Sequence, residues 1–171
     1  MKYYVSVCAL VLTTACGGAS APPPTTSASF AASPTTTTAT PSTGVTGDVS
    51  FQGLLNDVRA DAGSGAVSYN AQLDAAAQAH AQDMLDNNYF SHTGLNGSSV
   101  GDRATAAGYN WRTVGENIAS GYRSESSVLD AWVNSPGHQA NNINPAFEDF
   151  GLGYAADGSG TRWVLVLGAE R

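Results

Sequence analysis

Three residues of this 171-residue chain, His92, Glu116 and His138, have side chains that could bind a metal or take part in catalysis. His92 and His138 are two of only three histidines, and Glu116 lies between them in the sequence. Both histidines sit in segments punctuated by glycine, serine or proline, which are typical of the loops that often carry function. We therefore interpret the three side chains as parts of one assembled site.

Metal binding is one chemistry that these residue types support. Imidazole is a good zinc ligand, and two histidines, one carboxylate and a water complete a tetrahedral site that is open to substrate. Glu116 could be the third ligand, or it could orient a bound water from outside the ligand shell. His92, His138 and Glu116 thus form a candidate site for Zn²⁺ or another divalent cation. In the alternative interpretation, both histidines are hydrogen-bonded residues that hold loops together.

Hydrolysis is an alternative that involves Ser135, three residues before His138. In a serine-type reaction Ser135 would be the nucleophile and His138 its base, whereas in a metal-assisted reaction Glu116 would activate a zinc-bound water. However, a serine before a proline commonly ends a helix, and no motif in the sequence is sufficient by itself to indicate catalysis. We expect a binding protein rather than an enzyme.

The third histidine, His80, has a different interpretation. It lies on the apolar side of an expected helix, four residues before Met84. A lone helical histidine is more often a packing residue than a ligand, so we predict that His80 is part of the core. A metal pair formed with Asp83 is the weaker alternative.

Helical patterns surround the candidate site. Apolar residues recur at helical spacing after residues that favour a helix start. We expect four helices: one from Asp48 with a stop at Gly63, one over 71–86 capped by Asn70, a short one over 101–107, and one capped by Ser124. Pro136-Gly137 is expected to break the last helix and to direct His138 into a cleft.

The end of the chain changes to a strand pattern. Two extended runs, 151–155 and 162–167, flank the glycine-rich turn Asp157–Gly160 and predict a hairpin. The second run is apolar on both faces, so helices must cover both sides of the sheet. We therefore predict an α+β fold, a three-layer α-β-α sandwich, with Trp132, Trp163, Phe147 and Phe150 in its core.

The N-terminus has the pattern of an export signal. Lys2 precedes an apolar run over 5–12, which is too short to span a bilayer. Cys16 follows small residues and resembles the lipidated cysteine of a bacterial lipoprotein. We predict a signal peptide over 1–16 and an extracytoplasmic, envelope-bound lipoprotein, or a secreted protein if Cys16 is not lipidated.

Residues 17–47 are almost entirely alanine, proline, serine, threonine and glycine, without charge, which predicts a disordered linker. A single domain over 48–171 follows; both cysteines precede it, so it contains no disulfide. This domain has six arginines, no lysine and fourteen acidic residues. Its negative charge disfavours nucleic acid and anionic lipid headgroups as partners. We expect a monomer that meets the membrane through its lipid anchor.

An ordered set of motifs covers about residues 51–171: LLNDVRADAG, NNYFSHTG, DRATAAGY, GENIASG, SPGH and RWVLVLG. This set resembles the CAP superfamily, the SCP-like extracellular proteins, in its small bacterial branch. The resemblance implies the same α-β-α sandwich, with His92, Glu116 and His138 in a shallow cleft that binds a divalent metal in some members. Many eukaryotic members have a second glutamate where this chain has Ser135, so its cleft has one carboxylate fewer.

The resemblance, together with the linker, implies a cell-envelope binding module. Its expected ligand is a metal, a small apolar molecule or a cell-wall component. A surface hydrolase is the first alternative, and a structural or adhesive surface protein is the second.

Overall fold

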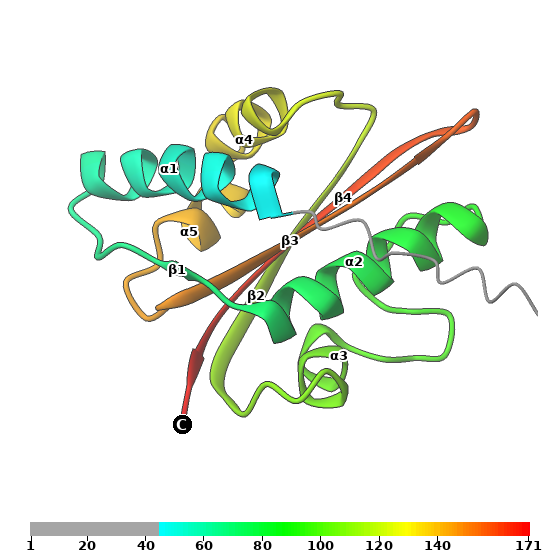
Figure 1. The fold of residues 1–171 in the computed structure, drawn as a ribbon, viewed down its shortest axis with the longest axis horizontal. Helices are drawn as coiled ribbons and strands as arrows, with labels where there is room; N and C mark the ends of the chain where they lie inside the picture. Colours follow the sequence, from blue (N-terminus) through cyan, green and yellow to red (C-terminus); the bar gives the residue numbers. More distant parts are fainter. Residues whose placement is uncertain (1–44) are drawn as a thin grey trace, which may run out of the picture. The chain divides into compact units, whose positions relative to one another are not determined.

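The computed structural model describes residues 45–171, the first five of them by their backbone alone. The predicted signal peptide, Cys16 and nearly all of the predicted linker lie outside this part of the chain. The elements are α1 Val45–Asp61, β1 Ser68–Tyr69, α2 Ala71–Asp86, α3 Val100–Ala106, β2 Trp111–Ser120, α4 Glu125–Val133, α5 Pro136–Asn142, β3 Asp149–Asp157 and β4 Gly160–Glu170 (Figure 1). None of the helices in the described region is long and apolar enough to cross a membrane.

The sheet has the strand order β1-β3-β4-β2. The predicted hairpin is confirmed, since β3 and β4 pair antiparallel with Asp157 opposite Gly160. The edge strand β2 pairs antiparallel with β4, and the two-residue β1 pairs parallel with β3. Neither β1 nor β2 was predicted. The sequence of β2 contains Gly115, Glu116 and Asn117, which are poor strand formers, so its pairing with β4 decides its conformation.

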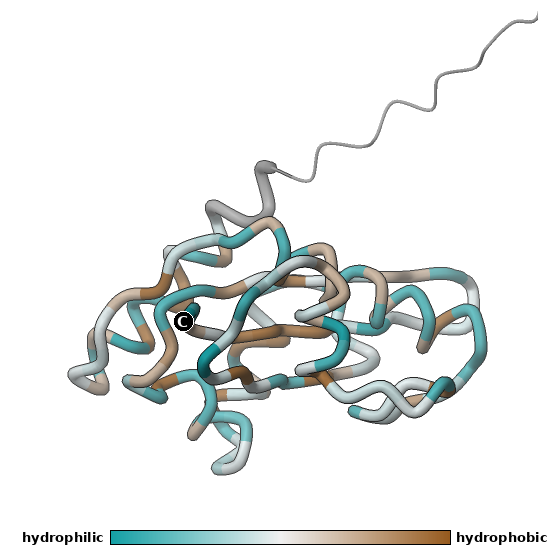
Figure 2. Tube along the Cα trace, turned by 90° about the horizontal axis from the view of Figure 1, so that it is seen from below, coloured by the Kyte–Doolittle hydropathy of each residue, from teal (hydrophilic) through white to brown (hydrophobic). Residues whose placement is uncertain are grey.

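Helices cover both faces of the sheet, as the apolar pattern of β4 predicted. Trp163, Leu165 and Leu167 pack into one core cluster with residues of α1 and α4. Val164 and Val166 point to the opposite face and pack with residues of α2. Figure 1 shows α1, α4 and α5 on one side of the sheet and α2 and α3 on the other, and hydrophobic stretches run through the interior in Figure 2. The three-layer α-β-α sandwich is confirmed.

The predicted helix starts are confirmed at two caps. The side chain of Asn70 accepts hydrogen bonds from the backbone N–H groups of Gln72 and Leu73 at the start of α2. Ser124 forms a capping box with Ser127 at the start of α4. These caps satisfy backbone donors that have no partner within the helix.

The helices differ from the prediction in several places: α3 begins and ends one residue before the expected 101–107, and α5 was not predicted. The first helix begins at Val45, ahead of the expected start at Asp48. Helix α4 does end before Pro136, at Val133, but Pro136-Gly137 does more than break a helix. Pro136 occupies the first position of α5, where its missing N–H has no cost and its fixed φ suits a helix. His138 therefore lies in the first turn of a helix rather than in a loop.

Helix α2 lies directly on β3 because two glycines allow it. A Cβ atom added to Gly151 would collide with the backbone of Asp74, and one added to Gly153 would collide with the backbone of Ala77. The alternating Gly151-Leu152-Gly153 therefore presents a flat face to α2 and a leucine to the other layer.

One buried charge links α1 to the segments that follow α4. Arg59 is 0% exposed, although arginine is rarely buried without a charged partner. Its guanidinium donates to the backbone carbonyls of Gly65 at 2.6 Å, Asn142 at 2.7 Å and Phe147 at 3.1 Å. Burial lowers the pKa of Arg59. The sequence analysis did not identify this residue, because two of its carbonyl partners come from distant parts of the chain.

Candidate functional site

The predicted site residues come from three different elements. His92 lies in the loop between α2 and α3, Glu116 lies in the middle of β2, and His138 lies in the first turn of α5. The structure joins His92 and Glu116 directly, with Nδ1 of the imidazole 2.8 Å from Oε1 of the carboxylate. The Glu116 side chain is 2% exposed, whereas that of His92 is 57% exposed. The carboxylate is thus a buried support behind an accessible ring.

Arg103, in α3, is the site residue that the sequence analysis missed. Its Nη2 donates to Oε2 of Glu116 at 2.6 Å. Both carboxylate oxygens of Glu116 are therefore engaged, one by His92 and the other by Arg103. One chemical argument could have indicated an arginine at this site. A buried glutamate requires a compensating charge, and this domain has six arginines and no lysine. The sequence does not show which of the six lies beside Glu116.

His138 has a neutral partner instead of a carboxylate. Its Nδ1 lies 2.8 Å from Oγ of Ser135, the residue that precedes α5. Burial lowers the pKa of His138, and the nearby charge of His92 lowers it further. No direct hydrogen bond joins His138 to Glu116 in the described structure.

A group of asparagines fixes α5 against β2. Nδ2 of Asn117 donates to the carbonyl oxygen of His138 at 3.0 Å and to Oδ1 of Asn142 at 2.9 Å. Nδ2 of Asn141 donates to the carbonyl of Glu116 at 3.2 Å and to Oδ1 of Asn117 at 2.9 Å. The backbones that carry Glu116 and His138 are thus connected by amide side chains.

His80 lies in the core, as predicted. It is 2% exposed, and its Nε2 lies 2.9 Å from the carbonyl oxygen of Ser91. Burial is the main cause of its lowered pKa, and the charge of Arg103 lowers it further. The alternative metal pair with Asp83 gains no support, because the Asp83 carboxylate accepts hydrogen bonds from the Tyr89 hydroxyl and from Nδ2 of Asn87.

A pocket of about 340 Å³ lies next to His138. Its lining is mostly apolar and includes the half-exposed ring of Phe90 as well as Ile118, Tyr122 and Trp132. Ser135 and His138 contribute polar atoms. This combination of apolar walls and a few polar groups is typical of sites for small ligands.

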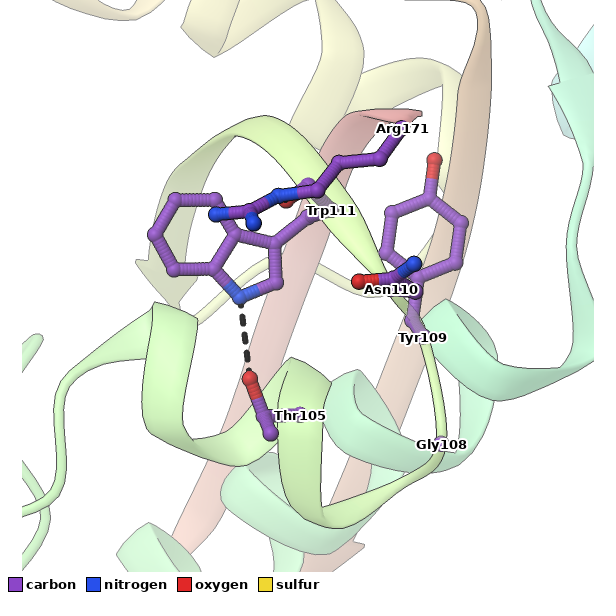
Figure 3. Close-up of a pocket in the computed structure, with 6 residues that line it drawn as sticks. All are labelled: Thr105, Gly108, Tyr109, Asn110, Trp111 and Arg171. Atoms are coloured by element: carbon purple, nitrogen blue, oxygen red, sulfur yellow. Dashed lines mark hydrogen bonds between the residues drawn. The ribbon is translucent and has the colours of Figure 1, made fainter.

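Another pocket, of about 360 Å³, is lined by none of the predicted site residues (Figure 3). Its walls include Trp111, whose Nε1 donates to Oγ1 of Thr105 at 3.0 Å. Nε of Arg171 donates to the carbonyl oxygen of Trp111 at 3.1 Å. These groups are engaged with one another, and we assign no chemistry to this pocket.

The donor set at the predicted site limits how a metal could bind. Within residues 45–171, no three His, Cys, Asp or Glu side chains converge so that they could hold a metal ion. The two imidazoles remain as donors, since each uses Nδ1 for a protein contact and the described structure shows no protein hydrogen bond at either Nε2. Glu116 has the position of a supporting group behind His92.

Comparisons with known proteins agree with this architecture. YkwD of Bacillus subtilis strain 168 is 39% identical over 106 residues, which are 62% of this chain and 41% of YkwD. YlbC, a membrane protein of the same organism, is 31% identical over 100 residues, or 58% of this chain and 29% of YlbC. The chain thus matches less than half of the length of these relatives.

Solved structures are similar over most of the described domain. An extracellular protein containing an SCP domain from Bacillus anthracis has a TM-score of 0.65 at 28% identity, over 74% of this chain and 41% of that chain. An outer surface protein of Borrelia burgdorferi has a TM-score of 0.66 at 21% identity, over 72% of this chain and 91% of that chain. The second likeness shows the fold alone.

The family model of the cysteine-rich secretory proteins, CAP, matches residues 52–167, from α1 through most of β4. The matched region includes His92, Arg103, Glu116, Ser135 and His138. The chain therefore belongs to the CAP family of cysteine-rich secretory proteins.

Proposed function

We propose that this chain is an exported CAP-domain protein that acts as a binding module outside the cytoplasm, with a cleft that takes a divalent cation between His92 and His138. The proposal rests on one observation: both histidine rings use Nδ1, and not Nε2, to contact the protein. In each ring Nδ1 contacts a protein partner at 2.8 Å, Glu116 for His92 and Ser135 for His138. A neutral imidazole that donates through Nδ1 presents its lone pair at Nε2.

Glu116 has a supporting role in this proposal. A histidine ligand commonly donates its second ring nitrogen to a carboxylate, which fixes the ring and raises its basicity. Because both Glu116 oxygens are engaged and its side chain is 2% exposed, we assign it this role rather than that of third ligand. With two protein donors, the site should bind Zn²⁺ weakly and exchangeably.

A calorimetric zinc titration of the protein and of the variants His92→Ala and His138→Ala tests this function. We expect one zinc per chain in the wild type and its loss in both variants, with His80→Gln as the control that keeps both donors. Both imidazoles must be neutral to bind the ion, so binding should weaken as the pH falls, and burial keeps His138 neutral to a pH below the ordinary imidazole value. No binding in the wild type, or loss in one variant only, would exclude a shared site.

The pocket beside His138 supports a second ligand class for the same module. Its apolar lining and volume of about 340 Å³ fit a small, partly apolar molecule or an apolar part of a wall component. Trp132 lines this pocket, so its fluorescence should respond to such a ligand. Phe90→Ala should reduce the response, whereas Leu95→Ala, which removes an exposed apolar side chain that does not line the pocket, should not.

Export and anchoring rest on the N-terminal signal pattern and on the B. anthracis relative, which is described as extracellular. We propose that Cys16 carries the lipid. Metabolic labelling with palmitate should mark the wild type at the membrane, whereas Cys16→Ala should be unlabelled. Label that persists in Cys16→Ala would exclude Cys16 as the lipid site, and no label in the wild type would leave a secreted protein.

Serine-type hydrolysis is the second candidate, because Oγ of Ser135 lies 2.8 Å from Nδ1 of His138. A serine hydrolase base normally takes the proton at Nε2 while a carboxylate supports Nδ1. Here the serine itself occupies Nδ1, so the ring lacks that support. Any hydrolysis of envelope substrates that persists in Ser135→Ala would exclude this mechanism.

A further inference from the structure

Arg103 contacts both the main chain of His92 and Glu116, the side-chain partner of His92. Its Nη2 donates to Oε2 of Glu116 at 2.6 Å and to the carbonyl oxygen of His92 at 3.1 Å. We infer that Arg103 is a positioning residue of the proposed metal site: it holds Glu116 as the support of His92 and prevents that carboxylate from becoming a metal ligand. This inference rests on the proposed function.

The position of Glu116 relative to the imidazole ring explains why this carboxylate does not become a metal ligand. Oε1 of Glu116 contacts Nδ1 of His92, and an ion would bind at Nε2, on the other side of the same imidazole. To reach the ion, the carboxylate would have to leave both His92 and Arg103. The Arg103 side chain is 12% exposed and that of Glu116 is 2% exposed, so water cannot readily replace either partner. The ion pair therefore keeps Glu116 behind the ring.

The same guanidinium also fixes the main chain that carries His92. Its Nη1 donates to the carbonyl oxygen of Ser98 at 2.9 Å, and that oxygen accepts a second hydrogen bond from the N–H of Gly94 at 3.0 Å. Arg103 thus holds the loop at His92 and at Ser98. Only a planar group with several fixed donors can bind these three acceptors together, so lysine is not equivalent.

The orientation of Arg103 leaves one of its own donors unsatisfied. Its Nε is buried and has no hydrogen-bond partner in the described structure. Buried donors without partners are rare in folded proteins because they are costly. The guanidinium is therefore oriented so that its two terminal nitrogens, and not Nε, make the contacts to Glu116 and to the His92 loop.

The test compares Arg103→Met and Arg103→Lys with Arg112→Met, the matched control. Arg112 also pairs with a glutamate, Glu148, but both side chains of that pair are more than half exposed. Nitrogen-15 NMR of the ring of His92 in metal-free protein reports which nitrogen carries the proton. We expect the Nδ1–H form in the wild type and in Arg112→Met, and a mixture of both forms in Arg103→Met.

Zinc titration supplies the second measurement. We expect Arg103→Met to reduce zinc affinity about tenfold or more, as loss of a group that orients a ligand does, and Arg103→Lys to restore part of it. If Arg103 acts through Glu116, adding Arg103→Met to Glu116→Gln should cause little further loss. Full additivity of the two substitutions would overturn the inference, and so would an unchanged tautomer with unchanged affinity in folded Arg103→Met.

The outcomes separate this inference from the proposed function. If the wild type binds no zinc, the proposed metal site is excluded, whereas the NMR comparison still tests whether Arg103 controls the tautomer of His92. If zinc binds and all three arginine variants match the wild type, the metal site stands and the role of Arg103 is refuted. If Arg103→Met does not fold, Arg103→Lys carries the test, and wild-type behaviour of that variant in both measurements refutes the inference.

Discussion

Oγ of Ser135 lies 2.8 Å from Nδ1 of His138, although Ser135 occupies the position from which a serine normally caps a helix. No side-chain cap forms at this end of α5. The hydroxyl faces the imidazole instead of the backbone N–H groups of the first turn. The two site histidines thus have unequal supports, a charged one for His92 and a neutral one for His138.

Ser135→Ala should therefore affect the site more than the fold. No helix cap is lost, so the melting temperature should change little, whereas zinc affinity should fall about tenfold because the ring of His138 loses its orienting partner. Ser126→Ala, at an exposed position in α4, is the control for hydroxyl removal. Equal zinc affinity in the two variants would show that the α5 backbone alone orients the ring.

His80 should make folding stability depend on pH. Its folded pKa is lowered below the ordinary 6.5, chiefly by burial, so the unfolded chain takes up the proton first as the pH falls. The stability is fully present above about pH 6.5 and decreases as the pH falls toward the folded pKa. Urea unfolding between pH 8 and pH 5 should show this loss. His80→Gln should flatten the curve, and an unchanged slope would exclude His80 as its source.

Gly153→Ala should destabilise the domain by about 3 kcal/mol, because the added methyl group meets the backbone of α2, which cannot move like a flexible side chain. Gly158→Ala is the matched control, since a Cβ atom at that position has no neighbour within 4 Å. Chemical unfolding measures both variants. A loss below about 0.5 kcal/mol for Gly153→Ala would mean that α2 and β3 separate easily.

Arg59→Met should cost about 3 kcal/mol or more, since it removes the shared donor of three carbonyl acceptors, and the bonds to Asn142 and Phe147 are buried. Arg123→Met, at an exposed position, should change stability by less than about 0.5 kcal/mol. Because Asn142 links Arg59 to Asn117, Arg59→Met should also weaken zinc binding. Stability equal to that of the control would show that methionine fills the site without loss.

The sequence by itself determined the layers of the fold and indicated His92 and His138 as candidate site residues. The apolar run of β4 required cover on both faces, and alternation along that strand assigns Leu165 and Val166 to opposite clusters. Caps at Asn70 and Ser124 could be predicted because their hydrogen bonds reach only two or three residues along the chain.

Only the tertiary structure decided which groups meet across long separations. Strand β2 forms because β4 lies beside it, although its own residues are weak strand formers. Arg103 reaches Glu116 and Arg59 reaches Asn142 through contacts that depend on how α3, α1 and α5 pack. Local pattern carries no information about which buried charge faces which partner, because hydrogen bonds between distant residues are set by packing rather than by spacing.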